Sequence, residues 1–283
     1  METTVSSACK EVIIADGLPT VLIGERINPA GKKAMANALK VENYDIVRKE
    51  AIAQVQAGAD IIDVNTTLFG ADESILLPKA VQVVMETVDI PLCIDSANPV
   101  ALEAALKIYR GKPLINSVTG EEKSLARVLP LVREVNTAVI WLPQDEQGIP
   151  MSTEKRFAVA HRIIERAEKE GISRDRIIID CLALAVGANP SSAIIALETA
   201  RRIKSELNVN ITVAVSNISF GMPDRNLINQ AFAAEMIAAG ATSLIVDVSK
   251  LRPCVLAADL LASRDKRARR YISAFRERLT AQQ

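Results

Sequence analysis

Short runs of β-branched and other apolar residues alternate along the chain with amphipathic segments of about 10 to 20 residues, a pattern typical of repeated β/α units around a parallel sheet. There are eight such runs, at residues 21–27, 61–66, 91–96, 113–119, 137–143, 177–184, 211–217 and 243–249. Eight strands, each followed by a helix, are typical of a closed barrel. The pattern therefore predicts one α/β domain, a single (β/α)8 TIM barrel over residues 21–283, preceded by an N-terminal extension over residues 1–20.

Several helix boundaries are marked by their residue types. The predicted helix starts share a capping side chain ahead of the first turn, at Asn98-Pro99, at Asn189-Pro190 and at the capping-box pair Thr119 and Glu122. The alanine-rich run 230–239 is expected to stop at Gly240. The rival fold is an open doubly wound sheet, but its nucleotide-binding form carries a G-x-G-x-x-G motif or a P-loop, and neither occurs here. The extension is expected either to close the bottom of the barrel or to be mobile.

Charge and hydropathy narrow the classes of partner. The 34 basic and 34 acidic residues cancel, so the chain lacks the net field expected of a protein that binds nucleic acid or an anionic membrane. No apolar run reaches the roughly 18 to 20 residues of a membrane span, and the N-terminus lacks the order of a secretion signal. We therefore expect a cytoplasmic enzyme that acts on a small molecule.

The four cysteines are scattered, with no C-x-x-C pair, and His161 is the single histidine. This spacing predicts buried free thiols and no zinc or iron–sulfur site. His161 lies in a predicted helix and is expected to have a surface or packing role. The last predicted helical stretch, 264–278, holds seven basic residues against Asp265 and Glu277. A solvated helix face is favoured there over docking of a partner or a second subunit.

In barrels of this class the active site lies at the C-terminal ends of the strands, so the polar residues that close each apolar run are candidates for it. They are acidic, amide or hydroxyl-bearing residues, namely Glu25, Asn28, Asp63, Asn65, Asp95, Ser96, Asn116, Ser117, Asp180, Ser216, Asn217 and Asp247. Each one alone has a structural explanation as a helix cap or turn residue. Together they indicate a ligand, because carboxylates close together in a cleft repel one another unless something satisfies them.

Two kinds of ligand fit this set of residues. Magnesium would bind Asp63, Asp95 and Asp180 through oxygen, although amides and hydroxyls are over-represented for that purpose. A flat polar heterocycle fits better, since the adjacent N–H donors of a pterin or a guanine match a carboxylate, and an Asn side chain both donates and accepts. With aromatic residues at 3%, recognition would rest on hydrogen bonds.

The order and spacing of six motifs resemble those of the methyltetrahydrofolate:corrinoid-protein methyltransferases. This family belongs to the pterin-binding barrel superfamily, with the dihydropteroate synthases and the folate domain of cobalamin-dependent methionine synthase. The motifs are IGERIN at 23–28, DVN at 63–65, CIDS at 93–96, INS at 115–117, IIID at 177–180 and SNISFGMPDRNLIN at 216–229. The resemblance implies a homodimer that moves a methyl group between N5 of tetrahydrofolate and the cobalt of a corrinoid. The direction stays open, with transfer toward tetrahydrofolate in a demethylation pathway as one option.

The resemblance also implies roles for individual residues. Asp95, Asn116 and Asp180 would hydrogen-bond the pterin ring, with Asp180 on the N3–H and 2-amino pair, and Asn217 would be catalytic at N5. The other implied substrate contacts are Ser216, Arg225, Glu25 and Asn65. Members of the family are expected to have a proline after the residue that corresponds to Asp180, where this chain has Cys181. No D-x-H-x-x-G cobalamin motif occurs, so the corrinoid is expected on a separate protein that docks over the barrel mouth.

Two alternatives stay open. A dihydropteroate synthase would be expected to carry a Ser-Arg-Lys type segment after the run 211–217, whereas residues 216–220 read Ser-Asn-Ile-Ser-Phe. The other alternative is a folate-binding barrel with no catalysis of its own. Asp63 and Asp247 receive no role.

Overall fold

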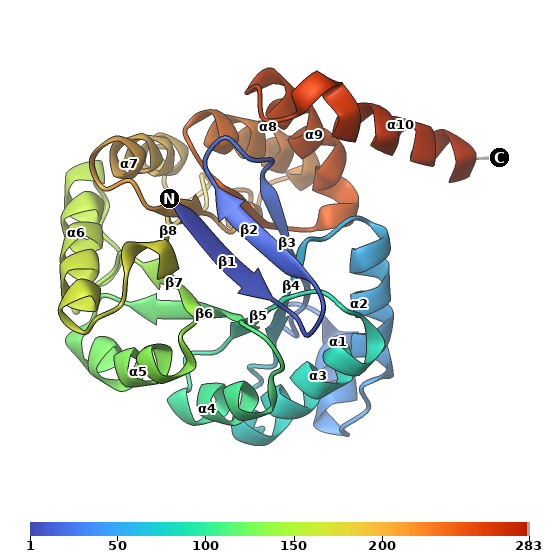
Figure 1. Ribbon diagram of the computed structural model, residues 1–283, viewed down its shortest axis with the longest axis vertical. Helices are drawn as coiled ribbons and strands as arrows, with labels where there is room; N and C mark the ends of the chain where they lie inside the picture. Colours follow the sequence, from blue (N-terminus) through green and yellow to red (C-terminus); the bar gives the residue numbers. More distant parts are fainter. Residues whose placement is uncertain (282–283) are drawn as a thin grey trace.

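The computed structural model describes residues 1–281 and shows a barrel of eight parallel strands surrounded by helices (Figure 1). The barrel strands pair in the order β10-β3-β4-β5-β6-β7-β8-β9. The chain just after β9 meets β10 through a parallel bridge between Ala214 and Ile245, so the barrel is nearly closed. The predicted single α/β barrel is confirmed.

The barrel strands lie where the apolar runs predicted them. Their bounds are β3 (Val21–Ile27), β4 (Ile61–Asn65), β5 (Leu92–Asp95), β6 (Leu114–Thr119), β7 (Ala138–Leu142), β8 (Ile177–Asp180), β9 (Asn210–Thr212) and β10 (Ser243–Val246). The run 211–217 differs most from its prediction, because β9 stops at Thr212 and the chain then forms a short 3-10 helix, η2 (Val215–Asn217). Asn217 therefore lies on a turn beyond the strand.

Helices cover the outside of the barrel. Their bounds are α1 (Lys33–Lys40), α2 (Asp45–Gln56), α3 (Glu73–Thr87), α4 (Pro99–Ile108), α5 (Glu122–Val135), α6 (Thr153–Lys169), α7 (Ser192–Glu206), α8 (Arg225–Ala238), α9 (Val248–Leu261) and α10 (Arg269–Ala281), with two short 3-10 turns, η1 (Arg174–Arg176) and η3 (Lys266–Ala268). None of the helices within residues 1–281 has the length and apolar character needed to cross a membrane.

Two of the predicted helix boundaries are confirmed. The Asn98 side chain accepts a hydrogen bond from the Val100 N–H at 3.0 Å and caps α4, with Pro99 in its first turn. α8 ends at Ala238, and Gly240 follows with a φ of +110°, a left-handed value that glycine adopts without a steric cost.

Two others are wrong. Asn189 forms a turn by accepting from the Ser191 N–H at 3.0 Å, and α7 begins only after Ser191. Thr119 remains in β6, where it pairs with Leu142 of β7, and the residue before α5 is Glu121, which makes no side-chain cap. Strand pairing has overridden the local capping signal at Thr119.

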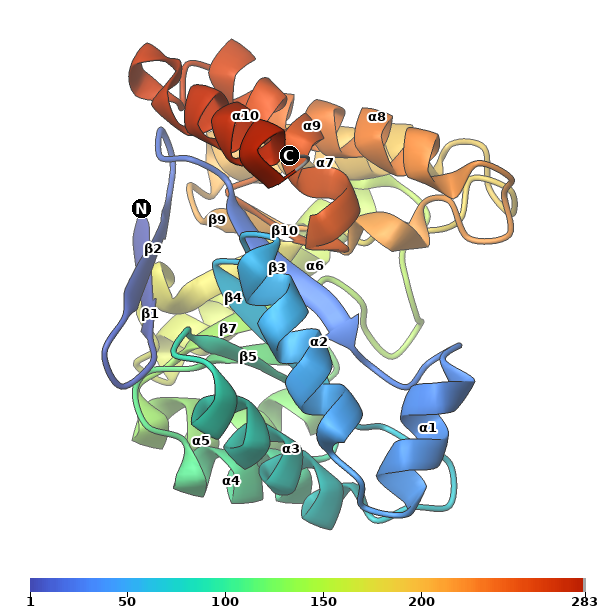
Figure 2. The same cartoon turned by 90° about the vertical axis from the view of Figure 1, so that its right-hand side faces the viewer.

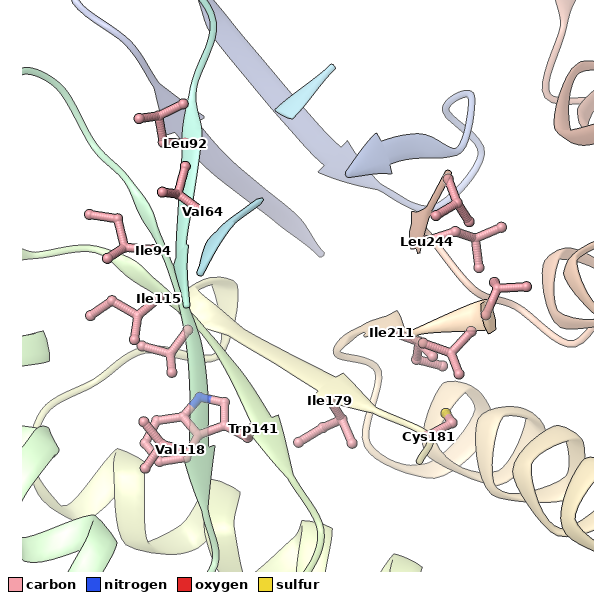
Figure 3. Packing of buried hydrophobic residues seen from close by; sticks show 14 of the residues in the cluster. Val64, Leu92, Ile94, Ile115, Val118, Trp141, Ile179, Cys181, Ile211 and Leu244 are labelled. Carbon is pink, nitrogen blue, oxygen red and sulfur yellow. The ribbon is translucent and has the colours of Figure 1, made fainter. Parts of the chain in front are cut away.

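Alternate side chains of each strand face the surrounding helices or the barrel interior. Residues such as Val64, Ile94 and Ile179 pack in the layer between strands and helices (Figure 3). The interior holds a separate apolar layer, made by Val21, Ile23, Ile61, Cys93, Leu114, Ala138, Ile140, Ile178 and Ile245. Two residues further along six of the eight barrel strands, the interior position is polar: Glu25, Asp63, Asp95, Asn116, Asp180 and Asp247. Strand geometry thus gathers these polar side chains at one end of the barrel.

The N-terminal extension closes the opposite end. It forms an antiparallel hairpin of β1 (Glu2–Ser6) and β2 (Glu11–Ala15) that lies across the barrel (Figures 1 and 2). Val5 and Ile14 are 0% exposed and belong to the interior apolar layer. The Asn210 side chain at the start of β9 donates to the Thr3 hydroxyl and to the Ile14 carbonyl, both at 2.8 Å. Of the two expectations for this segment, closure of the barrel bottom is the one observed.

Not all of the basic residues in the C-terminal segment 264–278 are exposed to solvent. Arg264 is buried and donates to the Thr20 hydroxyl at 3.0 Å and to the Ala241 carbonyl at 2.6 Å. Arg270 lies 3.6 Å from the buried carboxylate of Asp259. These two basic residues therefore hold the end of the chain on the barrel, which corrects the prediction for their positions.

The cysteines and the histidine are mostly placed as expected. Cys93 and Cys181 are buried free thiols, and Cys254 is half-buried. Cys9 is exposed, so the prediction was wrong for this residue, which lies in the tip of the hairpin. His161 is exposed on α6 with Nδ1 at 3.6 Å from a Glu165 oxygen, in agreement with a surface role.

The hairpin contact gives a stability test. We expect Ile14→Ala to lower the free energy of unfolding by about 2 to 4 kcal/mol, because the substitution removes apolar volume from the closed barrel interior. Ile13→Ala is the matched control, since this neighbouring side chain is 39% exposed, and it should cost less than about 1 kcal/mol. Urea denaturation measures both values. Equal losses for the two variants would show that the hairpin is not docked in the barrel.

Candidate active site

The polar end of the barrel opens into a cavity of about 810 Å³. This volume is in the usual range for a small-molecule site. The structure brings seven of the eight predicted contacts together around it, namely Glu25, Asp95, Asn116, Asp180, Ser216, Asn217 and Arg225, along with the unassigned Asp63 and Asp247. Asn65 is not among the lining residues.

Two amides hold two carboxyl groups in place at the floor of this cavity. Asn65 donates through Nδ2 to Asp95 Oδ2 at 2.9 Å, across the β4–β5 pair. Asn65 therefore orients Asp95, and its own side chain does not line the cavity. Asn116 donates in the same way to Asp63 Oδ1 at 3.0 Å, which leaves its carbonyl oxygen as a free acceptor. Asp63, which had no predicted role, thus fixes the orientation of Asn116.

Burial disfavours the charge on both of these carboxyl groups. Burial, and then the neighbouring charge of Asp95, raise the pKa of Asp63 well above its ordinary value, although the Asn116 hydrogen bond opposes them. Burial raises the pKa of Asp95 to about 6, against the effect of the Asn65 hydrogen bond. Their direct partners in these bonds are neutral amides, so the charge is stabilised by dipoles only. N–H donors of a ligand would therefore stabilise the ionised form.

Asp180 ends β8 and is 5% exposed. Its Oδ1 accepts from the Leu182 N–H at 2.7 Å. Burial raises the pKa of Asp180 to about 6, while this N–H and the charge of Arg156 lower it.

The position after Asp180 explains a departure from the expected proline. The Cys181 N–H donates to the Thr212 carbonyl of β9 at 3.0 Å, a bond that proline, which has no N–H, cannot form. The Cys181 side chain packs beside Ile179 and Ile211 in the layer between strands and helices (Figure 3). Cys181 is therefore a packing and strand-pairing residue.

The segment after β9 is braced from two sides. The Ser216 hydroxyl donates to Glu25 Oε2 at 3.0 Å. Arg225 donates to the Ser216 carbonyl at 2.7 Å and to the Ser219 hydroxyl at 3.0 Å, so that its guanidinium group holds η2 in place. Asn217, which η2 carries, is exposed to the cavity. Its amide is thus presented toward the mouth by a segment that both neighbours restrain.

Asp247 has a structural role at the edge of the cavity. It accepts from the Ser249 hydroxyl at 2.7 Å, and its carboxylate lies 3.3 Å from Lys250 and 3.7 Å from Arg26. Burial alone would raise the pKa of Asp247, but these donors and positive charges outweigh burial and lower it. Its charge is therefore already satisfied, in contrast to Asp95 and Asp180.

Several charged residues of the site were not predicted from the sequence. Arg26, Lys32 and Lys250 line the cavity, and Lys32 Nζ donates to the Arg26 carbonyl at 2.8 Å. Lys32 and Lys250 lie just beyond the apolar runs. Arg26 lies within the first run, where only its acidic and neutral neighbours were predicted to be site residues. No sequence pattern indicated that Arg156 lies behind Asp180, because Arg156 is on α6, far from β8 in the sequence.

This arrangement suits a flat heterocycle with several N–H groups. Asp95, Asn116 and Asp180 offer acceptor oxygens from three strands at the cavity floor, and carboxylates accept such N–H groups in pairs. The Asn217 amide lies nearer the solvent, where it can meet a reacting atom.

Comparisons with known proteins agree with this geometry. The family model described as pterin binding enzyme matches residues 24–247. The methylcorrinoid:tetrahydrofolate methyltransferase of Eubacterium limosum is 32% identical over 264 residues, which are 91% of this chain and 96% of that protein. The methionine synthase of Mycobacterium leprae (strain TN) is 31% identical over 266 residues, and the match covers 89% of this chain but 22% of that longer protein.

Solved structures share the barrel. The dihydropteroate synthase of Vibrio fischeri ES114 superposes with a TM-score of 0.69 at 18% identity, over 93% of this chain and 99% of that one. The enzyme of the same name from Xanthomonas albilineans gives a TM-score of 0.70, also at 18% identity and with the same coverage. At this identity the likeness shows the fold alone. The family model and the relative from Eubacterium limosum confirm the resemblance inferred from the six motifs, and the chain belongs to the pterin-binding enzyme family.

Proposed function

We propose that this protein transfers a methyl group between N5 of tetrahydrofolate and the cobalt of a corrinoid that a separate protein carries. One observation carries the proposal: the buried Asp180 and the half-buried Asp95 and Asn116 offer acceptors at the floor of an open cavity, which the exposed Asn217 also lines. The name of the Eubacterium limosum relative, methylcorrinoid:tetrahydrofolate methyltransferase, supports the choice of reaction, since the match extends over nearly the whole of both chains.

The pterin ring would lie on the cavity floor. Asp180 accepts from N3–H and the 2-amino group, because a carboxylate offers two oxygens to two adjacent donors. Asp95 and the free carbonyl oxygen of Asn116 accept from the remaining N–H groups on the ring edge. Asn65 and Asp63 keep these two groups oriented through the hydrogen bonds at 2.9 and 3.0 Å. The residues that touch the ring are thus fixed before it binds.

Asn217 would act at N5. In transfer from methyltetrahydrofolate, the N5–CH3 bond breaks, its electron pair stays on N5, and the cobalt supplies the pair for the new bond to carbon. A neutral tertiary amine leaves poorly, so N5 must be protonated, and the carbonyl oxygen of Asn217 accepts a hydrogen bond from that N–H. In the reverse direction the N5 pair attacks the methyl group, cobalt keeps the pair of the broken bond, and N5 then loses a proton to solvent. Here Asn217 orients N5 for in-line attack.

The open mouth leaves room for a corrinoid protein to dock over bound tetrahydrofolate. We propose in addition that the protein is a homodimer and is cytoplasmic. The homodimer follows from the motif resemblance, and the two buried free thiols are typical of a reducing compartment.

Two assays separate the proposed function from the two alternatives, one with a methyl donor and one with a pterin pyrophosphate and 4-aminobenzoate. The protein is incubated with tetrahydrofolate and a methylated corrinoid protein, with free methylcobalamin as a second methyl donor, and the cobalt spectrum is followed. Methyl transfer predicts loss of the methylcobalt band and formation of methyltetrahydrofolate. Folate binding without spectral change with either donor would support a non-catalytic folate-binding barrel. Condensation of a pterin pyrophosphate with 4-aminobenzoate would support a dihydropteroate synthase.

Removal of the Asn217 amide should separate rate from binding. We expect Asn217→Ala to slow methyl transfer by about 100-fold, since it removes one hydrogen bond that forms with the reacting nitrogen. Folate affinity should change by less than about threefold, because the ring contacts remain. Stopped-flow rates and calorimetric titration measure the two quantities, with Gln82→Ala, an exposed amide on α3, as the control. An unchanged transfer rate would remove Asn217 from the mechanism.

The raised pKa of Asp180 predicts a conflict between stability and binding. Its pKa in the folded protein is about 6, above the ordinary 3.8, so the folded state binds this proton more tightly than the unfolded chain does. The ionised carboxylate therefore costs stability above pH 6, and the cost disappears as the pH falls below about 4. Asp180→Asn keeps an acceptor for the Leu182 N–H without the charge. We expect it to raise the free energy of unfolding of the ligand-free protein near pH 7.5 by roughly 1 to 3 kcal/mol.

The same variant should bind folate at least about tenfold more weakly, because a charged acceptor is replaced by a neutral one. Wild-type affinity should fall as the pH drops through 6. Denaturant unfolding near pH 7.5 and near pH 4.5, with calorimetric folate titrations, tests both effects. A variant that is less stable than the wild type near pH 7.5, or that binds folate equally well, would refute the role given to Asp180.

A further inference from the structure

The carboxyl group of Asp180 stands at a turned end of β8. Leu182 has a φ of +55°, a left-handed conformation that is uncommon for a leucine. In this conformation its N–H donates to Asp180 Oδ1 at 2.7 Å. The direction of the carboxyl therefore depends on whatever keeps the Cys181–Leu182 turn in place.

Arg156 on α6 holds that turn from behind. Its Nη1 donates to the carbonyls of Cys181 and Leu182, both at 2.7 Å, and its Nε donates to the Pro150 carbonyl at 2.9 Å. The residue is 0% exposed and is not part of the cavity wall. A buried guanidinium is costly where its N–H groups are unused. Here Nη1 and Nε are bonded, whereas Nη2 has no hydrogen-bond partner among the described residues. Arg156 thus fixes two consecutive peptide groups next to Asp180.

Arg156 is also the cation behind Asp180. Burial lowers the pKa of Arg156, whereas Cys181 and then Asp180 raise it. In return, Arg156 lowers the pKa of Asp180 against the effect of burial. The other carboxyl groups of the cavity belong to other elements: Glu25 to β3, Asp63 to β4 and Asp95 to β5, while Asp247 precedes α9. Asp63 and Asp95 influence each other, so Arg156 supplies the positive charge that acts on Asp180.

We propose that Arg156 is a positioning residue: from α6 it clamps the Cys181–Leu182 turn and places a positive charge behind Asp180, so that the carboxylate faces the pterin. The inference rests on the pterin-binding role proposed above for Asp180. The same contacts explain how the turn after Asp180 is held in place although the next residue is Cys181 and not a proline. The clamp on the two carbonyls restrains the turn, and the Cys181 N–H remains free to pair with Thr212.

Two substitutions separate the clamp from the charge. Arg156→Met removes both, whereas Arg156→Lys keeps the charge but has neither the Nε that bonds Pro150 nor the planar group that fixes Nη1 between the two carbonyls. Arg162→Met is the matched control, because Arg162 is on the same helix but pairs with Asp145 at 2.9 Å on the exposed side. Two readouts are used. The first is carboxyl 13C NMR titration of Asp180 in the ligand-free protein, assigned with Asp180→Asn, and the second is calorimetric affinity for tetrahydrofolate as a function of pH.

The expected results differ between the variants. Arg156→Met should raise the titration midpoint of Asp180 by about one pH unit, the low end of the effect of a nearby opposite charge, and should move the pH dependence of affinity by the same amount. Arg156→Lys should keep the midpoint but bind tetrahydrofolate about three- to tenfold more weakly, as expected from loss of a hydrogen bond that holds the turn. Arg162→Met should leave both readouts unchanged.

An unchanged Asp180 midpoint in Arg156→Met would overturn the proposal and leave Arg156 with a packing role only. If Arg156→Met does not fold, the Arg156→Lys variant tests the proposal. An affinity of this variant for tetrahydrofolate equal to that of the wild type would overturn the clamp. If the wild-type protein binds no folate, the proposed function fails. The NMR titration, which needs no ligand, then still tests whether Arg156 controls Asp180.

Discussion

Carboxylates buried without paired cations raise the free energy of a folded protein, and this barrel holds two of them, Asp63 and Asp95, on neighbouring strands of one interior layer. Asp180 stands in the same layer, with Arg156 behind it. Contacts in the rest of the structure offset the free-energy cost of burying this layer. Amides of Asn65 and Asn116 donate to the first two carboxylates, and a backbone N–H donates to the third. Beneath them, an apolar layer closed by the N-terminal hairpin supplies hydrophobic burial.

Under the proposed function, binding and catalysis occupy different depths of the cavity. The residues proposed to accept from the ring are the buried Asp180 and the half-buried Asp95 and Asn116. Neighbours hold them, so they are preorganised for a ligand that brings N–H donors. Asn217 is exposed on η2, and its segment is braced by the contacts of Ser216 and Arg225. A methyl group that reacts at that level would face the open mouth, where a second large molecule can reach it. The floor of the cavity would thus give affinity and orientation, and the exposed amide would act where the bond changes.

Much of the fold followed from sequence periodicity. The eight apolar runs located the eight barrel strands, and polar residues at the ends of seven of the runs marked the cavity, because strand ends in a parallel barrel share one face. What escaped prediction depended on contacts between distant segments. The pattern could not show that Asn65 turns to Asp95, that β9 gives way to η2 before Asn217, or that Arg156 of α6 reaches the end of β8. Local signals also failed at Thr119, where strand pairing outweighed the capping box.

Under the proposed function, Asp95 and Asp180 accept the N–H groups of the pterin in their ionised form. Counting the protons exchanged on binding tests it most directly. Folic acid is suitable because its oxidised N5 is not basic, and calorimetric titrations in buffers of different ionisation enthalpy give the number. The account predicts net proton release near pH 6, since binding favours the ionised forms of Asp95 and Asp180, whose pKa values are raised to about 6, and less release at higher pH. Net proton uptake near pH 6, or an exchange that does not vary with pH, would contradict it.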